Sequence, residues 1–132
     1  MNAKKQILFV DDDELILTCF KRLLGNRYKI GTALGADRAL EAIKHDSYAV
    51  VASDMRMPGM NGIELLRKIK ETSPEIVGIL LTGNPEFQDS GGLESDNGYF
   101  RRIAKPCPTA DLVAAIEEAL EQYSLNTQVS TQ

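Results

Sequence analysis

The sequence has little that would place the chain in a membrane or in an oxidising compartment. Its longest nearly continuous apolar run covers only residues 76–81, whereas a membrane-spanning helix needs roughly 18 or more. The apolar run behind the basic start, residues 7–10, is shorter than the ~7–15 residues of a secretory signal. Cys19 and Cys107 are too few for a disulfide scaffold and lack metal-ligand spacing, so we expect a reduced, cytoplasmic setting.

An excess of positive charge is also absent. Lys and Arg number 15 against 19 Asp and Glu, and the net charge of −4 gives no electrostatic footprint for nucleic acid or anionic lipid. The 132 residues, 43% hydrophobic and 26% charged, fit one ordinary globular domain. We expect residues 1–123 to form this domain and the polar, uncharged residues 124–132 to be a tail or linker.

Short apolar runs alternate with stripes of apolar residues at helical spacing. The runs predict strands over residues 7–10, 28–32, 49–52, 76–81 and 99–104. The stripes predict four helices, with core positions at Leu15, Ile16, Cys19, Phe20, Leu23 and Leu24, then Ala36, Ala39, Leu40 and Ile43, then Leu65, Leu66 and Ile69, and finally Leu112, Val113, Ile116 and Leu120.

This alternation predicts a doubly wound α/β fold, in which a five-stranded parallel sheet has helices on both faces. The first, third and fourth strands are apolar on both faces and belong in the centre of the sheet. The second strand carries Lys29, and the fifth carries Arg101 and Arg102, so these two strands are expected at the edges. With right-handed crossovers, the strand order 2-1-3-4-5 satisfies this pattern.

The segment between the fourth and fifth strands is a poor helix. Residues 86–98 contain only two large apolar residues, Phe87 and Leu93, and carry Gly91 and Gly92 in the middle. Each interior glycine costs a helix about 1 kcal/mol relative to alanine. We therefore expect the fourth helix to be short or irregular.

Polar residues follow four of the predicted strands. Asp11 and Asp12 follow the first strand, Asp54 the third, Thr82 the fourth and Lys105 the fifth. The carboxyl ends of parallel strands meet at one edge of the sheet, where such folds bind their ligands. Taken singly, each residue has a plain structural explanation, such as a turn residue or a solvated acid. Their joint occurrence at one edge predicts a functional site.

The chemistry of this set points to phosphoryl transfer. Two carboxylates ~5 Å apart repel by about 3 kcal/mol at an effective dielectric constant near 20, so their cluster needs a positive partner. Hard oxygen ligands suit Mg²⁺, and a lysine ammonium suits phosphate. A carboxylate can also attack phosphorus itself and form an acyl phosphate. Phosphoryl transfer requires little more than such positioning and charge neutralisation.

Four segments together resemble the receiver domain of bacterial two-component response regulators, which has the CheY-like fold. They are residues 7–12 (ILFVDD), 53–62 (SDMRMPGMNG), 81–83 (LTG) and 104–106 (AKP), and the resemblance spans residue 5 to about 122. It implies a phosphorylation-dependent signalling switch and not an enzyme. At most, the domain would phosphorylate itself from small donors and hydrolyse its own acyl phosphate.

The resemblance also implies roles for individual residues. Asp54 would accept a phosphoryl group from a sensor histidine kinase or a phosphotransfer protein. Asp11, Asp12 and Asp54, with the backbone carbonyl of Arg56, would bind Mg²⁺. Thr82 and Lys105 would contact the phosphoryl group.

Further features of such receivers concern regulation and partners. Arg56 and Asn84 match the positions that tune the dephosphorylation rate, and the Lys105–Pro106 bond is expected to be cis. Residues 53–66 look most like receivers fused to ATPase-type transcription activators or to cyclic-dinucleotide phosphodiesterases. A covalently linked effector domain is therefore an expected partner, whereas no direct binding to nucleic acid or membrane is expected.

The sequence departs from the family where signals are transmitted. Three residues before the lysine, receivers of this kind carry Phe or Tyr, but this chain has Arg102, and Phe100 lies one pleat away. Together with the glycine-broken segment 86–98, Arg102 leaves open a pseudo-receiver, an interaction module with weakened switching.

An enzyme is the other alternative. Asp11 could be the nucleophile of a haloacid-dehalogenase-like phosphatase, with Thr82 and Lys105 as its second and third motifs. Leu15 stands where that family has a small β-branched residue, and no acidic pair follows a strand after Lys105. Flavin binding is weaker still, since the loop after the first strand presents acids where phosphate needs donors.

Overall fold

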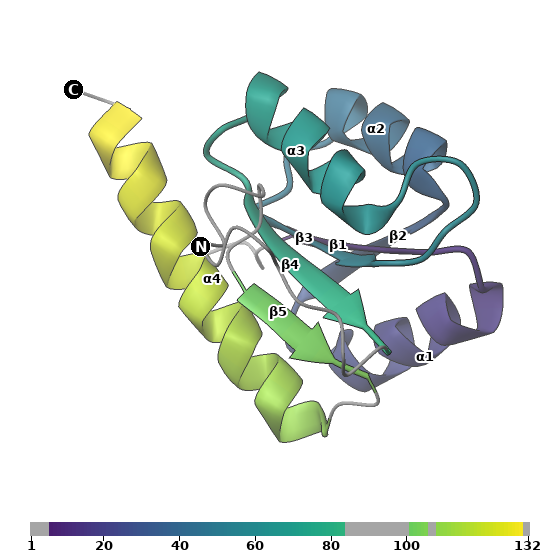
Figure 1. Cartoon of the computed structure of the whole chain (residues 1–132). Helices are drawn as coiled ribbons and strands as arrows, with labels where there is room; N and C mark the ends of the chain where they lie inside the picture. The colour runs from purple at the N-terminus through teal and green to yellow at the C-terminus, as the bar shows by residue number, and fades with distance from the viewer. Residues whose placement is uncertain (1–5, 84–100, 106–107, 131–132) are drawn as a thin grey trace.

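The structure is a computed structural model, which describes residues 6–83, 101–105 and 108–130 (Figure 1). The predicted irregular helix over 86–98, Asn84, Phe100 and the Lys105–Pro106 bond lie outside these described residues. The elements in chain order are β1 (Gln6–Asp11), α1 (Glu14–Leu24), β2 (Lys29–Leu34), α2 (Ala36–His45), β3 (Val50–Asp54), α3 (Gly62–Thr72), β4 (Val77–Thr82), β5 (Arg101–Ala104) and α4 (Thr109–Ser130).

The strands form one parallel sheet in the order β2-β1-β3-β4-β5, which confirms the predicted topology. Strands β3 and β4 are buried along their whole length, and β1 is buried beyond its first residue. The exposed side chains of Lys29 in β2 and of Arg101 and Arg102 in β5 lie on the two edge strands. Buried strands therefore occupy the centre of the sheet and charged strands its edges, as their sequences predict.

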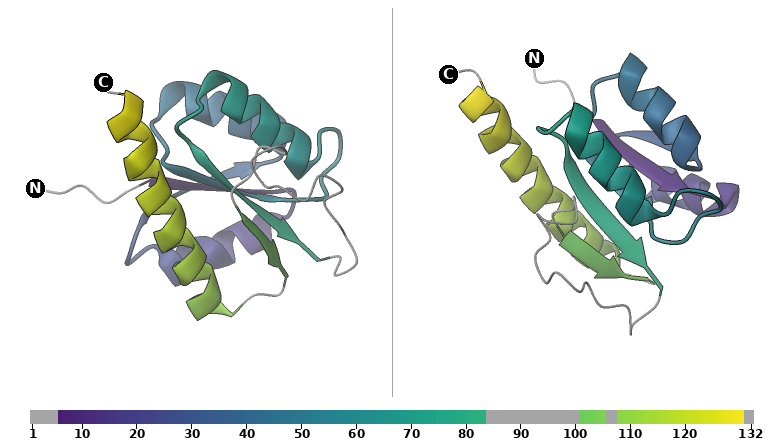
Figure 2. Two further views of the ribbon diagram at one scale, coloured as in Figure 1. Left: turned by 60° about the vertical axis from the view of Figure 1, so that its left-hand side comes forward. Right: turned by 45° about the horizontal axis from the view of Figure 1, so that its top comes forward.

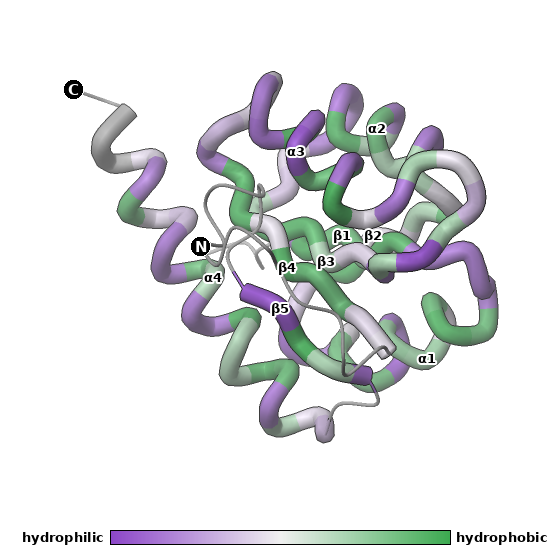
Figure 3. Tube along the Cα trace, viewed as in Figure 1, coloured by the Kyte–Doolittle hydropathy of each residue, from purple (hydrophilic) through white to green (hydrophobic). Residues whose placement is uncertain are grey.

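Two helical layers cover the sheet, one on each face (Figure 2). Ile7 and Phe9 point into the layer of α1 and α4, whereas Leu8 and Val10 point into the layer of α2 and α3. This separation follows from the strand period of two, which sends alternate side chains to opposite faces. Figure 3 shows the hydrophobic residues concentrated in the central strands and thinning toward the outer surfaces of the helices.

Helix α1 is rotated relative to the predicted core stripe. Leu15 and Leu23 are 76% and 58% exposed and Cys19 is also exposed, so the prediction that these three face the core is wrong. The buried side chains are Leu17 and Leu24. Phe20, which lies between them at helical spacing, stacks on Phe9 of β1 with 4.4 Å between ring centroids. Both sides of α1 carry apolar residues, and the aromatic contact belongs to the side that packs.

Helix α4 continues past Tyr123, where the sequence predicts the end of the domain. Residues 124–130, which the sequence predicts as part of a polar tail or linker, are helical. Gln122 donates a hydrogen bond to Asn126 (2.8 Å), and the Asn126 side chain donates to the backbone oxygen of Glu75 (3.1 Å). Polar side chains thus fasten the helix to the turn before β4. No helix within the described ranges combines the length and apolar character that a membrane span requires.

A buried tyrosine joins the start of β2 to helix α4. Tyr28 is 4% exposed, and its hydroxyl donates a 2.5 Å hydrogen bond to Oε2 of Glu117. Burial, with added contributions from the hydrogen bond and negative charge of Glu117, raises the pKa of Tyr28 to about 12. The folded state therefore holds the phenolic proton more tightly than the unfolded chain does.

We predict that Tyr28→Phe lowers the free energy of unfolding by roughly 1–3 kcal/mol at neutral pH, because it removes a hydrogen bond to a charged acceptor. The parent's advantage is fully present below the unfolded pKa of about 10 and declines as the pH rises toward the folded pKa of about 12. Urea unfolding of parent and variant between pH 8 and pH 11.5 measures this difference. A difference that stays constant across the range would contradict the assignment.

Candidate functional site

The register of β1 and β3 brings two aspartates side by side. Val10 pairs with Ser53, so Asp11 and Asp54, each the next residue in its strand, lie on neighbouring strands at the same edge of the sheet. Both are buried, with exposed fractions of 2% and 8%. Parallel pairing therefore places the two carboxylates together, although they are far apart in the sequence.

The same logic continues along β4 and β5. Asp54 pairs with Leu81, which puts Thr82 one residue further along the edge. Thr82 pairs with Ala104, and the backbone N–H of Lys105 donates to the oxygen of Thr82 at 2.7 Å. Thr82 is buried and Lys105 is half-buried. The predicted site residues on all four strands thus share the carboxyl edge of the sheet.

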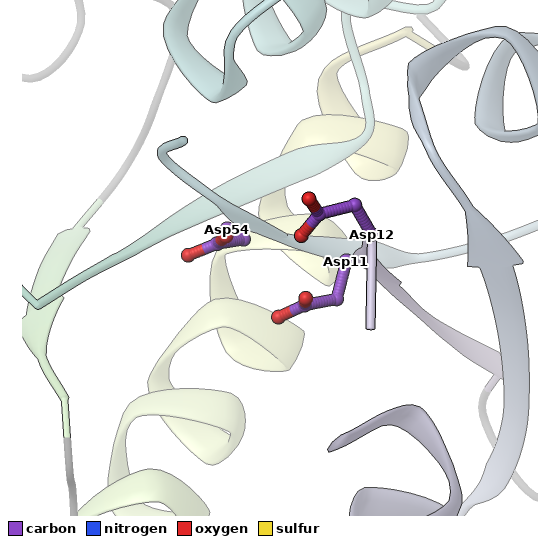
Figure 4. A group of neighbouring side chains, drawn as sticks. All are labelled: Asp11, Asp12 and Asp54. Carbon is purple, nitrogen blue, oxygen red and sulfur yellow. The ribbon is translucent and has the colours of Figure 1, made fainter. Parts of the chain in front are cut away.

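Three carboxylates form the centre of this edge. Asp11, Asp12 and Asp54 each offer an oxygen, and these oxygens all lie within 4.8 Å of one another. Figure 4 shows Asp11 and Asp12, at the end of β1, directed toward the same space as Asp54. Asp12 is exposed and leaves the cluster open to solvent. The prediction that these acids gather at one place is confirmed as geometry.

Lys105 is the counter-charge of this cluster. Its Nζ donates a 2.9 Å hydrogen bond to Oδ1 of Asp54 and lies 3.5 Å from Oδ2 of Asp11. One ammonium faces three carboxylates, so the ionised cluster has an excess of two negative charges. Such an excess attracts a divalent cation more strongly than a monovalent one.

The ionisation of Asp11 and Lys105 reflects the crowding. Burial raises the pKa of Asp11, and the charge of Asp54 raises it further, against the lowering effects of the Asp13 N–H and of Lys105. Burial alone would lower the pKa of Lys105, but the hydrogen bond and charge of Asp54, helped by Asp11, outweigh it and leave the pKa raised. Lys105 is therefore charged at neutral pH.

One oxygen of Asp11 has the ion-pair contact with Lys105 but no hydrogen bond within the described part of the chain. Oδ1 accepts a 3.0 Å hydrogen bond from the backbone N–H of Asp13, whereas the buried Oδ2 has no hydrogen-bond partner among the described residues. A buried carboxylate oxygen without a hydrogen bond is costly. A metal ion bound between the carboxylates would satisfy it, so this donor set of oxygens fits Mg²⁺.

The loop after β3 is shaped by two glycines. Gly59 has φ of +80°, a backbone conformation that favours glycine. Gly62 opens α3 against the end of β3, where a Cβ would lie only 2.4 Å from the backbone oxygen of Asp54. Asn61 and Glu64 close a capping box over this helix start. Gly62 is a site residue that was not predicted from the sequence; its signal is a small residue at the first position of a helix.

The remaining predicted residues lie around the centre. Arg56 is exposed and lines an open cavity of 450 Å³ together with Asp12, Met55 and other residues of this loop. Arg102 is exposed on β5 and lines a separate cavity between β5 and α4. The structure therefore brings Arg56, but not Arg102, to the end of the sheet where the carboxylate cluster lies.

The chain is similar to response regulators along most of its length. The family model "Response regulator receiver domain" matches residues 7–117. The DNA-binding transcriptional regulator NtrC of Escherichia coli K12 is 32% identical over 120 residues, which are 90% of this chain and 25% of NtrC. The chain spans about a quarter to a third of the length of the curated relatives it matches.

Solved structures show the same similarity. The crystal structure of adenylate cyclase from Rhodopirellula baltica superposes with a TM-score of 0.90 at 36% identity, over 97% of this chain and 96% of that one. Response regulator TrrA of Thermotoga maritima, in complex with Mg²⁺ and BeF, gives 0.77 at 28% identity, over 88% and 99%. None of these similarities favours a phosphatase, a flavin-binding protein or a pseudo-receiver. With its parallel sheet and its acidic edge, the chain belongs to the response regulator receiver domain family.

Proposed function

We propose that residues 1–123 form a phosphorylation switch in which Asp54 is the phosphoacceptor. The observation that carries this proposal is the contact of Lys105 Nζ with Asp54, beside the carboxylates of Asp11 and Asp12. Asp54 accepts a hydrogen bond from the ammonium of Lys105, while Asp11 and Asp12 supply an excess of negative charge. This arrangement combines an attacking oxygen, a metal site and an ammonium within one cluster.

In the proposed reaction, a carboxylate oxygen of Asp54 attacks the phosphorus of a phosphohistidine on a sensor kinase or phosphotransfer protein. The O–P bond forms as the P–N bond breaks, and the electron pair returns to the imidazole, which takes up a proton from water. Mg²⁺, when bound by Asp11, Asp12, Asp54 and the carbonyl of Arg56, would neutralise charge on the phosphoryl oxygens.

Lys105 and Thr82 would contact the phosphoryl group on Asp54 and respond to its charge. Phosphorylation replaces the carboxylate that Lys105 contacts with a phosphoryl group, and the ammonium can follow it as a point charge. Thr82 lies on the strand between Asp54 and Lys105, from which its hydroxyl can donate to a phosphoryl oxygen. Movement of these two residues would pass the signal to β4 and β5.

Regulation and partners belong to the same proposal. Arg56 and Asn84 would tune the lifetime of the acyl phosphate, and Arg102 would alter the coupling to β5. A sensor histidine kinase or phosphotransfer protein would be the phosphodonor, in the cytoplasm. Because the chain matches only a quarter of NtrC, an effector domain linked to it is a further proposed partner, and contact with DNA would belong to that effector.

Mass spectrometry tests the acceptor. With Mg²⁺ and a small phosphodonor such as acetyl phosphate, the parent should gain the mass of one phosphoryl group, and Asp54→Asn should gain none because an amide is not a nucleophile toward phosphorus. Asp37→Asn, at an exposed aspartate of α2, is the matched control and should be phosphorylated like the parent. A phosphorylated Asp54→Asn beside an unmodified parent would contradict the proposal.

Metal binding distinguishes two adjacent acids. Asp12→Asn should weaken Mg²⁺ binding by about tenfold or more, equivalent to about 1.4 kcal/mol of lost attraction. Asp13→Asn should leave binding close to that of the parent, because Asp13 lies outside the cluster and asparagine keeps its cap on α1. Amide chemical shifts during an Mg²⁺ titration measure both. Equal weakening by the two variants would show general electrostatics and no defined site.

The role of Lys105 separates metal binding from switching. Lys105→Met should bind Mg²⁺ at least as tightly as the parent, because a repelling charge is gone, yet beryllofluoride should no longer change hydrogen exchange in β4 and β5. Lys68→Met, at an exposed position of α3, should behave like the parent in both measurements. If beryllofluoride changes exchange in the parent only around the pocket, the chain is a pseudo-receiver and the switching proposal fails.

A further inference from the structure

Positive charge is concentrated at one edge of the sheet, although the chain as a whole is acidic. Residues 21–38 form the end of α1, all of β2 and the start of α2. They contain five basic residues and one acidic residue, which are Lys21, Arg22, Arg27, Lys29, Arg38 and Asp37. The net charge of this segment is +4, so the rest of the chain, with 10 basic and 18 acidic residues, carries −8. Because β2 is an edge strand, the basic segment lies at the edge of the sheet opposite β5 (Figure 1).

A cavity of 490 Å³ opens between α1 and β2 at this edge. Its lining includes three basic residues, Lys21 and Arg22 of α1 and Arg38 of α2. Glu14 is the acidic residue among the described ones that line it, and it lies about 10 Å along the axis of α1 from Lys21. The three basic side chains are exposed, and none makes a hydrogen bond or ion pair within the described part of the chain. The cavity therefore has an excess of positive charge.

The position of Arg38 is not explained by the stability of its own helix. Helix α2 begins at Ala36, so Arg38 lies in its first turn, where the helix dipole favours acids and disfavours cations. Lys21 and Arg22, in contrast, lie in the last turn of α1, where the dipole favours them. An anion bound in the cavity would offset the unfavourable position of Arg38.

The outer edge of β2 has no neighbouring strand within the described ranges. The N–H of Gly35, which directly follows β2, donates a 3.0 Å hydrogen bond toward β1. Backbone groups of successive residues in a strand point alternately to its two sides, so those of Ile30, Thr32 and Leu34 point to the open edge. Edge strands are commonly protected by lysine or proline, but residues 30–34 (IGTAL) contain neither. An extended segment can therefore pair with this edge.

We propose that the β2 groove, defined as residues 30–34 together with Lys21, Arg22 and Arg38, binds a short acidic segment of a partner protein in an extended conformation. The backbone of this segment pairs with the open edge of β2 as a further strand of the sheet. Alternate side chains of an added strand point to the face covered by α1, where the cavity lies, so carboxylates at alternate positions reach the basic residues. Leu34, which is 40% exposed, offers an apolar contact.

Other anionic occupants fit this groove less well. A nucleic acid backbone supplies phosphate acceptors but no N–H donors, so it cannot satisfy both kinds of group on a strand edge. The charge of −8 on the rest of the chain also repels a long polyanion. Pairing of two copies through β2 would bring together two segments that each carry +4. A short acidic peptide contacts only the basic segment and avoids both kinds of repulsion.

The groove matches a short peptide in length. Its strand residues, 30–34, span about 13 Å, so a segment of about five to seven residues covers it. A contact of this size is smaller than a stable protein interface, which buries ~800 Å² on each partner. We therefore expect weak, reversible binding that weakens as the salt concentration rises.

A probe peptide of seven alternating glutamate and valine residues, with glutamate at both ends, tests the recognition of charge. In a titration followed by amide chemical shifts, it should shift the signals of residues 21–38. It should also bind at least tenfold more tightly than the same peptide with glutamine in place of glutamate. Equal affinity of the two peptides, or shifts confined to other parts of the chain, would overturn the proposal.

N-methylation of the probe tests strand pairing. In an extended peptide the N–H groups of the glutamates and those of the valines point to opposite sides, so only one set faces β2. N-methylation of that set should weaken binding by at least tenfold, whereas N-methylation of the other set should not. Equal effects of the two modifications would exclude a strand-like contact.

Substitutions test the basic residues of the groove. Arg38→Gln, and Lys21→Gln with Arg22→Gln, should each weaken binding of the glutamate probe by at least fivefold. The control, Lys44→Gln with Lys68→Gln, removes two exposed charges outside the groove and should leave the affinity unchanged. If the control loses as much affinity as the groove variants, net charge alone explains the binding and the proposal fails.

Two further measurements separate the occupants. A single-stranded DNA with the net charge of the probe should bind at least tenfold more weakly than the probe, and sedimentation velocity should show no self-association that Arg38→Gln weakens. DNA binding as tight as that of the probe, or such self-association, would assign the groove to nucleic acid or to a second copy and overturn the proposal. These measurements use the unphosphorylated chain, so their failure leaves the proposed switch standing.

Discussion

Mutual repulsion between carboxylates is the constraint around which this domain is arranged. Asp11 and Asp54 are buried on neighbouring strands, and the sheet tolerates them because Lys105 reaches both from the edge strand. The backbone N–H of Asp13 and the open position of Asp12 further reduce the cost. The remaining excess of negative charge makes the site receptive to a cation. The same repulsion that favours cation binding also makes the cluster depend on Lys105, which follows the edge strand β5.

Much of this arrangement could be predicted because parallel strands have a simple register. Strand β3 is apolar up to the polar residues that end it, so the position of Asp54 at the edge follows from counting along the strand. The buried and charged strands likewise fixed the order of the sheet. The same counting predicts Thr82 and Lys105 at the edge, and the register of β4 and β5 confirms their places. What the side chains do there stays a proposal.

The features that the sequence did not predict have a common physical cause. They depend on contacts that form only in the folded chain. Helix α1 is apolar on two sides, and only its contact with the sheet decides that Leu17 is buried while Leu15 is exposed. The end of α4 reads as a polar tail, but Asn126 finds a backbone acceptor at Glu75, a partner that only the folded chain supplies. Gly62 was missed because its importance lies in the backbone of Asp54, which approaches it closely.

The length of α4 has a mechanical consequence. Its 22 residues make a rod of about 33 Å, whereas the six residues of β4 span about 20 Å, so the rod projects beyond the layer on which it lies. A rotation of about 5° near its first turn would carry the far end through about 3 Å, if the rod stays straight. A small rotation of α4 beside β5 would therefore produce a larger displacement of its far end at Ser130.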